Sequence, residues 1–178
     1  MERKRLQQGL VQVYTGDGKG KTTCALGLAL RAVGQGFKVF MVQFMKGRDT
    51  GEARAAARLA PELTLRYFGR PGLVNLKAPD PEDLVLINEA RELARRVMES
   101  GDYDLVILDE INLALAYGLI PLEDMLTWLR ARPPWVEVVL TGRQAPAELV
   151  AFADLVTEMR PVKHYYAAGV PARRGIEW

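Results

Sequence analysis

Apolar runs of five to eight residues recur along the chain and alternate with longer segments whose apolar positions follow a helical period. Runs rich in β-branched and aromatic residues predict strands at 10–14, 37–44, 63–68, 103–110, 136–142 and 155–159. Helical spacing predicts helices at 21–33, 52–59, 81–100, 112–117, 121–129 and 146–152. This alternation is typical of a parallel sheet covered by helices. The nearly continuous apolar run at 37–44 favours a strand that is buried on both faces.

The ends and the buried sides of two helices follow from the same pattern. Gly34 is a stop signal after the first helix, while Asp80 and Pro81 are a cap and a first helical residue for the third. The side chains expected to be buried are apolar ones at helical spacing: Leu26, Leu30 and Val33 in the first helix, and Leu84, Ile87, Leu93 and Val97 in the third.

A glycine-rich turn joins the first predicted strand to the first predicted helix, and it reads Gly-Asp-Gly-Lys-Gly-Lys-Thr-Thr over residues 16–23. Glycines let successive backbone N–H groups point at an anion, and a helix start adds free N–H groups and the positive end of a dipole. Lys21 would neutralise phosphate charge, and Thr22 would offer a hydroxyl to Mg²⁺. Thr15 stands where the common pattern has its first glycine, so the loop is one residue shorter than usual and the seating of the nucleotide stays open.

An ordinary glycine turn before a helix is the alternative, but the order of glycines, lysines and threonines after a strand argues against it. We therefore expect an α/β fold of the P-loop NTPase-like (RecA-like) class, in which helices cover both faces of a mostly parallel six-stranded sheet in three layers. The residues predicted to bind the nucleotide are those of the turn: Gly16, Asp17, Gly18, Lys19, Gly20, Lys21, Thr22 and Thr23.

Two carboxylates, Asp109 and Glu110, follow four consecutive apolar residues, which is a Walker-B type of arrangement. A carboxylate at this position can hold Mg²⁺ directly or through water, opposite Thr22. A strand that ends in a charged turn is the alternative, and the phosphate loop about ninety residues earlier favours the metal role. Which of the two carboxylates touches the metal stays open.

Loops after the predicted strands carry further candidates, because open parallel sheets bind ligands at the carboxyl ends of their strands. Lys46 and Arg48 could approach an anion or a substrate there, with solvated loop charges as an equal alternative. Arg143 is a candidate contact for a phosphate or a leaving group, with a structural ion pair as the alternative. The loop at 69–81 has two glycines and three prolines, and its length predicts that it borders a bulky ligand.

Length and charge limit the number of domains and the classes of partner that we expect. The chain has 178 residues and a net charge of +2, which fit one nucleotide-binding domain over 1–178 and give no reason to expect nucleic acid or membrane as a partner. A short N-terminal arm is expected at 1–8 and an irregular tail at 160–178. The N-terminus does not read as a secretory signal, so we expect a cytoplasmic protein. Cys24 is expected to be packed, and His164, the only histidine, to be a surface or hydrogen-bonded residue.

The recognisable signals all concern a nucleoside triphosphate and Mg²⁺. The sequence has no nucleophile elbow, no Ser–His–Asp order and no kinase catalytic-loop motif. Two function classes fit these observations: an enzyme that acts on the triphosphate, and a binding or switch module gated by a nucleotide.

Segments in order across nearly the whole chain resemble the ATP:corrinoid adenosyltransferase family, in the branch that has a phosphate loop. They are Gly-Asp-Gly-Lys-Gly-Lys-Thr-Thr at 16–23, Val-Gln-Phe-Met-Lys-Gly at 42–47, Val-Ile-Leu-Asp-Glu at 106–110, Thr-Gly-Arg at 141–143, and Arg-Pro-Val-Lys-His at 160–164 with Ala-Gly-Val at 168–170 and Gly-Ile-Glu at 175–177. The segments at 42–47 and 160–164 are the more specific ones, and the shortened loop also matches the family.

The resemblance implies that a corrinoid reduced to Co(I) attacks the ribose C5′ of ATP and that inorganic triphosphate leaves. It implies ATP and a corrinoid as substrates, Mg²⁺ or Mn²⁺ as the metal, a flavoprotein as a candidate reductant, and a homodimer. A P-loop kinase or ATPase, and an ATP-gated corrinoid-binding module without turnover, are the alternatives.

Residue roles are implied in the same way. The loop from Gly16 to Thr22 would bind the phosphates, with Lys21 as the catalytic residue. Thr22 and Glu110 would hold the metal, with Asp109 as a further metal candidate, and Arg143 would contact the nucleotide. Phe68 is implied as a corrinoid contact, because family members crowd the lower corrin face with aromatic residues; the Phe-x-Trp pattern of some relatives is absent from this region.

Overall fold

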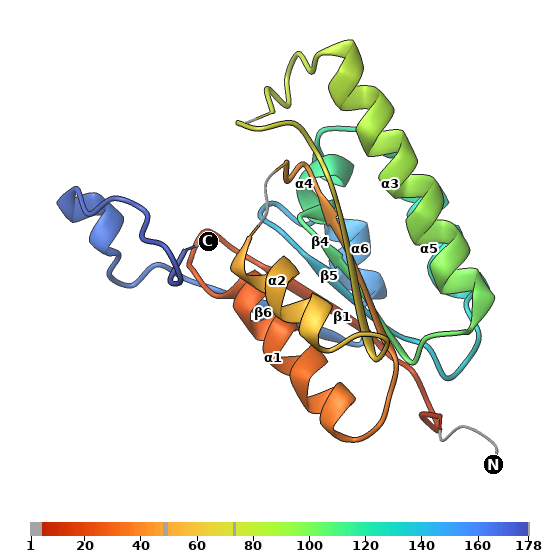
Figure 1. Cartoon of the computed structure of the whole chain (residues 1–178). Helices are drawn as coiled ribbons and strands as arrows, with labels where there is room; N and C mark the ends of the chain where they lie inside the picture. The colour runs from red at the N-terminus through yellow and green to blue at the C-terminus, as the bar shows by residue number, and fades with distance from the viewer. Residues whose placement is uncertain (1–4, 48–49, 73, 178) are drawn as a thin grey trace.

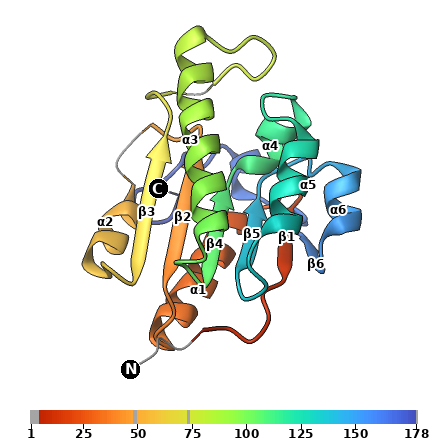
Figure 2. The ribbon, with the colours of Figure 1, turned by 90° about the vertical axis from the view of Figure 1, so that its right-hand side faces the viewer.

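Six parallel strands form the single sheet of the computed structural model, which describes residues 5–47, 50–72 and 74–177. Figure 1 shows the whole chain, and Figure 2 shows the strands side by side in the order β3-β2-β4-β5-β1-β6. The strands are β1 (Val11–Thr15), β2 (Val39–Phe44), β3 (Leu63–Phe68), β4 (Leu105–Asp109), β5 (Glu137–Thr141) and β6 (Leu155–Glu158). Each predicted strand therefore has a counterpart, and no strand end differs from its prediction by more than two residues.

Helices cover both faces of the sheet, which confirms the predicted three layers. The helices are α1 (Lys21–Gly34), α2 (Gly51–Arg58), α3 (Pro81–Ser100), α4 (Ile111–Ala116), α5 (Leu122–Ala131) and α6 (Ala147–Phe152). In Figure 2, α3, α4, α5 and α6 lie in front of the sheet and α1 lies behind it. Two separate hydrophobic clusters match these layers, a larger one under α3–α6 and a smaller one under α1 and α2.

The central strands are buried along their whole length. Every residue of β2, β4 and β5 is buried, as the nearly continuous apolar runs predict for parallel strands covered on both faces. At one edge, by contrast, all of β6 is exposed.

The buried side of α1 differs from the prediction. Leu30 is 60% exposed, and the positions that face the sheet are Ala25 and Ala29. Small side chains let this helix lie close to the sheet, so the larger leucine is turned outward; Leu26 and Val33 are only partly buried. Cys24 is likewise exposed, so the prediction of a packed thiol is wrong.

The ends of α1 and α3 test the predicted start and stop signals. α1 ends at Gly34, one residue beyond its predicted end, and the glycine with a positive φ, 80°, is Gly36, just after the C-cap residue Gln35. Asp80 caps α3 through reciprocal bonds with Asp83, and Pro81 is its first residue, as predicted. Leu84, predicted to be buried, is 44% exposed because the first turns of α3 extend past the sheet, as Figure 2 shows.

The carboxyl ends of the strands gather the loops of interest at one edge of the sheet. β5 lies between β1, which leads into the glycine-rich loop, and β4, which ends in the two carboxylates. The tail beyond β6 leaves the body of the molecule, forms the short 3-10 helix η1 (Tyr165–Ala168), and returns toward the start of α1 (Figure 1). Within the described residues, no helix has the length and apolar character needed to cross a membrane.

Candidate functional site

The glycine-rich loop between β1 and α1 rests on the end of β6. The Gly18 N–H donates to the Met159 carbonyl at 2.7 Å, and a Cβ on Gly16 or Gly18 would lie 2.5 or 2.7 Å from that same oxygen. Gly16 and Gly20 also have positive φ values of 90° and 125°, which side chains disfavour. The glycines are therefore required both by the curl of the loop and by its close packing against the neighbouring strand.

Lys21 lies across the inside of this loop. Its ammonium donates to the carbonyls of Gly16 at 2.7 Å and Gly18 at 2.8 Å, and only 8% of the residue is exposed. Burial lowers the pKa of Lys21, and the nearby charges of Glu110 and Asp17 act in the opposite direction. A phosphate group in the loop would offer this ammonium an anionic partner in place of two neutral carbonyls.

Asp109 is the centre of a buried polar network at the end of β4. Its carboxylate is fully buried and accepts hydrogen bonds from four side chains on four different elements or loops. The donors are Thr22 Oγ1 at 2.8 Å, Thr141 Oγ1 at 2.6 Å, Gln43 Nε2 at 3.1 Å and Lys46 Nζ at 2.7 Å. The structure thereby joins the loop threonine to the first of the two predicted carboxylates.

Glu110 lies beside this network and faces open space. It has a φ of 63°, and its N–H donates to Thr141 Oγ1 at 3.1 Å. Burial, and then the neighbouring charge of Asp109, raise the pKa of Glu110, and the cations Lys46, Lys21 and Arg143 oppose that shift. Glu110 lines two cavities at this edge of the sheet, so its carboxylate is accessible to a bound cation.

The donor set near Thr22 suits a hard divalent cation. Carboxylate and hydroxyl oxygens are the ligands that Mg²⁺ prefers, and Mg²⁺ usually takes only one or two carboxylates together with water and substrate phosphates. Gln43 Nε2 donates to Asp109, and no donor among the described residues reaches the buried Gln43 Oε1, to which a metal-bound water would give a donor. The described residues contain no group of three or more His, Cys, Asp or Glu side chains placed to hold a metal ion.

Two adjoining cavities open onto these residues. The phosphate cavity, of about 590 Å³, is lined by residues 17–23 of the loop and by the tail residues His164, Gly175, Ile176 and Glu177. The second cavity, of about 620 Å³, is lined largely by apolar residues of the loops after β2 and β3, with Leu113 of α4. The side chains shared by both form a common wall: Lys46, Glu52, Glu110, Arg143 and Glu177.

The remaining predicted site residues are placed as follows. Arg143 pairs with Asp17 of the loop at 3.6 Å, so the structure shows the ion pair named as the alternative while Arg143 still faces both cavities. Thr23 also lines the phosphate cavity. Lys19 points away from the loop interior, toward the tail. His164 accepts a hydrogen bond from the Tyr166 N–H at 3.1 Å, as expected of a hydrogen-bonded histidine.

The loop after β3 forms one wall of the second cavity. Pro71, Gly72, Val74 and Leu76 line the cavity, and Arg70 holds the loop to α3 through two bonds of 2.8 Å to the carboxylate of Asp83. Phe68 is partly buried against the hydrophobic core and is not among the described residues that line either cavity. Arg48 lies outside the described residues.

Sequence reasoning missed the roles of several polar residues. Lys46, considered as a contact for an anion, pairs with Asp109 and, at 3.7 Å, with Glu52. Asn112 donates to the carbonyls of Tyr14 and Gly142 and ties the ends of β1 and β5 together. Gln43 was the available signal, because a single polar residue within a buried apolar run needs a polar partner.

Comparison with known proteins identifies the family. A profile described as ATP:corrinoid adenosyltransferase BtuR/CobO/CobP matches residues 7–178. A corrinoid adenosyltransferase from Pseudomonas aeruginosa is 38% identical over 175 residues, covering 98% of this chain and 86% of the relative. The corrinoid adenosyltransferase CobA from Salmonella typhimurium is 36% identical over 173 residues, covering 97% of this chain and 87% of the relative.

A solved structure shares the fold. The flagellar accessory protein FlaH from Methanocaldococcus jannaschii superimposes with a TM-score of 0.59 at 14% identity, covering 86% of this chain and 72% of FlaH. At this identity the likeness concerns the fold, and it agrees with the RecA-like class expected from the sequence. The family assignment rests on the full-length sequence matches: the chain belongs to the ATP:corrinoid adenosyltransferase family.

Proposed function

We propose that this protein transfers the 5′-deoxyadenosyl group of ATP to the Co(I) centre of a reduced corrinoid and releases inorganic triphosphate. The observation that carries the proposal is the pair of adjoining cavities. One is built on a phosphate loop, the other is mostly apolar, and both share the wall that holds Glu110 and Arg143. Such a pair can hold two different substrates with their reacting atoms close together.

The reaction needs orientation and charge stabilisation more than acid–base chemistry. The Co(I) electron pair forms the bond to C5′, the C5′–O5′ bond breaks, and its electrons leave with the triphosphate oxygen. No proton is removed in this step, which agrees with the absence of any general-base motif from the sequence. In this proposal the loop N–H groups and Lys21, whose ammonium lies inside the loop, would stabilise the negative charge on the leaving triphosphate.

The metal proposal concerns three residues. Thr22, Asp109 and Glu110 would hold Mg²⁺, or Mn²⁺ in its place, against the phosphates. When bound, the metal neutralises phosphate charge. The Thr22 hydroxyl donates a hydrogen bond to Asp109. This hydrogen bond has to break if Thr22 turns its oxygen to the metal.

The corrinoid proposal concerns the second cavity. The loop after β3 presents aliphatic side chains, Val74 and Leu76, to this space, which suits a large and mostly apolar ring. Phe68 remains our aromatic candidate for the lower corrin face. To act there it would have to leave its packing against the core, so we expect substitution of Phe68 to affect the corrinoid KM and leave the ATP KM unchanged.

The remaining expectations are also proposals. We infer one nucleotide-binding domain over 1–178 with an N-terminal arm at 1–8 and a tail at 160–178, a cytoplasmic location, a homodimer and a flavoprotein reductant. Sedimentation equilibrium tests the homodimer directly, and a single species with the mass of one chain would contradict it.

One assay tests the reaction against its alternatives. Protein, Mg²⁺, ATP and chemically reduced cobalamin are mixed in the dark, and both the spectrum and the phosphate products are followed. We expect a light-sensitive Co–C product together with triphosphate. ADP and phosphate would indicate a kinase or ATPase instead, and binding without turnover would indicate a nucleotide-gated module.

A further inference from the structure

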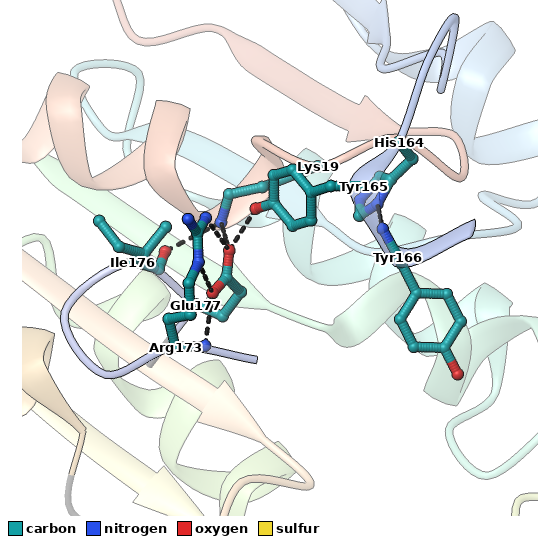
Figure 3. Close-up of polar contacts among 7 residues, drawn as sticks. All are labelled: Lys19, His164, Tyr165, Tyr166, Arg173, Ile176 and Glu177. Atoms are coloured by element: carbon teal, nitrogen blue, oxygen red, sulfur yellow. Dashed lines mark hydrogen bonds and ion pairs between the residues drawn. The ribbon is translucent and has the colours of Figure 1, made fainter. Parts of the chain in front are cut away.

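The C-terminal loop, defined here as residues 164–177, closes on itself around one carboxylate. The Tyr165 hydroxyl donates to Glu177, and the Arg173 backbone N–H and guanidinium donate to the same carboxylate at 2.6, 3.3 and 3.4 Å (Figure 3). The Arg173 guanidinium also lies 4.8 Å from the centre of the Tyr165 ring. These contacts join the two ends of the C-terminal loop, whose regular structure is limited to η1.

The closed loop is attached to the phosphate loop through Lys19. The Lys19 ammonium donates to the Ile176 carbonyl at 2.9 Å and lies 3.7 Å from the Glu177 carboxylate. Glu177 therefore serves two purposes at once, because it closes the C-terminal loop on one side and pairs with the body of the molecule on the other. Figure 3 shows Lys19 and Arg173 approaching this carboxylate together.

Glu177 lies at the candidate site itself, so this attachment can affect the shape of the two cavities. Glu177 lines both the phosphate cavity and the second cavity, and its side chain is 18% exposed. A carboxylate beside a triphosphate would normally repel it, but here two cations lie against it. The hydrogen bonds from Tyr165 and Arg173 hold the pKa of Glu177 at about 2, so it stays ionised and paired at neutral pH.

We propose that Glu177 is a positioning residue for the nucleotide: it clamps the C-terminal loop to Lys19, so that this loop forms a fixed wall of the phosphate cavity at its junction with the second cavity. The inference rests on the proposed function for one point, the identity of the second substrate. The binding of a nucleotide in the phosphate cavity rests on the phosphate loop alone. Losing the clamp would free the wall and lower the affinity for ATP without changing the groups that act on the leaving triphosphate.

The test compares two neighbouring arginines. Arg173→Gln removes the guanidinium that closes the loop, and Arg174→Gln removes the same charge from an exposed position outside the cluster. We expect Arg173→Gln to raise the KM for ATP about three- to tenfold with kcat within about twofold of wild type. Amide exchange over 173–177 should accelerate in this variant, and the midpoint of thermal unfolding should not move, because the cluster lies outside both hydrophobic cores.

Tyr165→Phe, which removes only the hydroxyl, should shift the KM for ATP in the same direction by a smaller factor. If Arg173→Gln behaves like Arg174→Gln in both KM and amide exchange, the clamp does not position the nucleotide and the inference is overturned. A failure of the proposed function is distinguishable, since wild-type protein would then bind Mg·ATP and form no Co–C product. In that case the same variants are compared by equilibrium binding of Mg·ATP.

Discussion

We expect catalysis to depend most directly on the side chain of Lys21. It is buried inside the loop, and its ammonium is placed within the curl that would receive the phosphates. Lys21→Ala should lower kcat/KM for ATP about a hundredfold or more, because the charge on the leaving triphosphate loses the ammonium inside the loop. Initial rates of Co–C bond formation measure the effect.

Lys38→Ala is the matched control for Lys21→Ala. Lys38 is exposed just before β2, at the opposite end of the sheet from the site, so its removal should leave the rate unchanged. Equal losses in the two variants would contradict the assignment of Lys21. Circular dichroism separates loss of catalysis from loss of fold, since Lys21→Ala also leaves two loop carbonyls without their donor.

Glu110 should make the metal-free protein less stable as pH rises. Its pKa is raised in the folded state, so the folded protein holds this proton more tightly than the unfolded chain does. The free energy of unfolding should therefore fall as pH rises from the ordinary Glu pKa, about 4.3, through the raised native pKa. Glu110→Gln should remove this loss, stabilising the protein at neutral pH in EDTA while lowering transfer activity.

Urea unfolding at a series of pH values in EDTA measures this difference. The gain in Glu110→Gln should vanish below about pH 4, where both states of the wild type are protonated at this site. Glu123→Gln, at an exposed position of α5, serves as the control. A gain that does not change with pH would show that the carboxylate charge is not its source.

At the residue scale, the sequence predicted which residues carry the chemistry but not which of them contact one another. The loop lysine and threonine and the paired carboxylates follow from their order after a strand. The network around Asp109 does not, because it depends on which strands are neighbours. Gln43 is the register partner of Asp109 across β2 and β4, and Thr141 approaches from β5. Strand order is a property of the whole sheet, and no local pattern contains it.

At the scale of elements, two glycines with ordinary backbone angles make a matched test of the packing between the phosphate loop and β6. Gly18 is held against Met159, where an added Cβ would lie 2.7 Å from a carbonyl oxygen, whereas an added Cβ on Gly27 in α1 would meet, among the described residues, no atom within 4 Å beyond its own stretch of helix. Gly18→Ala should destabilise the protein by about 1–3 kcal/mol and weaken ATP binding, since the loop must move away from the strand. Gly27→Ala should stabilise it by about 0.5–1 kcal/mol.

Denaturant titration and equilibrium binding of ATP measure both glycine variants. Unchanged ATP affinity in Gly18→Ala would mean that the loop can bind phosphate without resting on β6.

The side chains of α1 show why such packing is hard to predict. The periodicity of apolar residues pointed to Leu30, but the depth of contact is set by Ala25 and Ala29, and a pattern of hydrophobicity does not distinguish a close helix from a distant one.

At the scale of the whole molecule, the parallel order of the sheet explains how the site is assembled. The ends of β1, β2, β4 and β5 come together, and Asp109 and Asn112 bind across them. Six strands and their covering helices could be predicted because each is marked locally by its period. The shared wall of the two cavities could not, since its residues come from three loops, one helix and the tail.

That shared wall predicts thermodynamic coupling between the two substrates. Each ligand would meet Glu110 and Arg143, so ordering of these side chains by one ligand lowers the cost of binding the other. Mg·ATP should tighten the binding of a Co(II) corrinoid, which does not attack C5′, by roughly five- to fiftyfold, and the corrinoid should tighten ATP binding by the same factor. Titration of each ligand in the absence and presence of the other measures both factors. Arg143→Gln should reduce the two factors equally, and the exposed Arg174→Gln should leave them unchanged; independent binding in the wild type would mean that the two cavities do not act as one site.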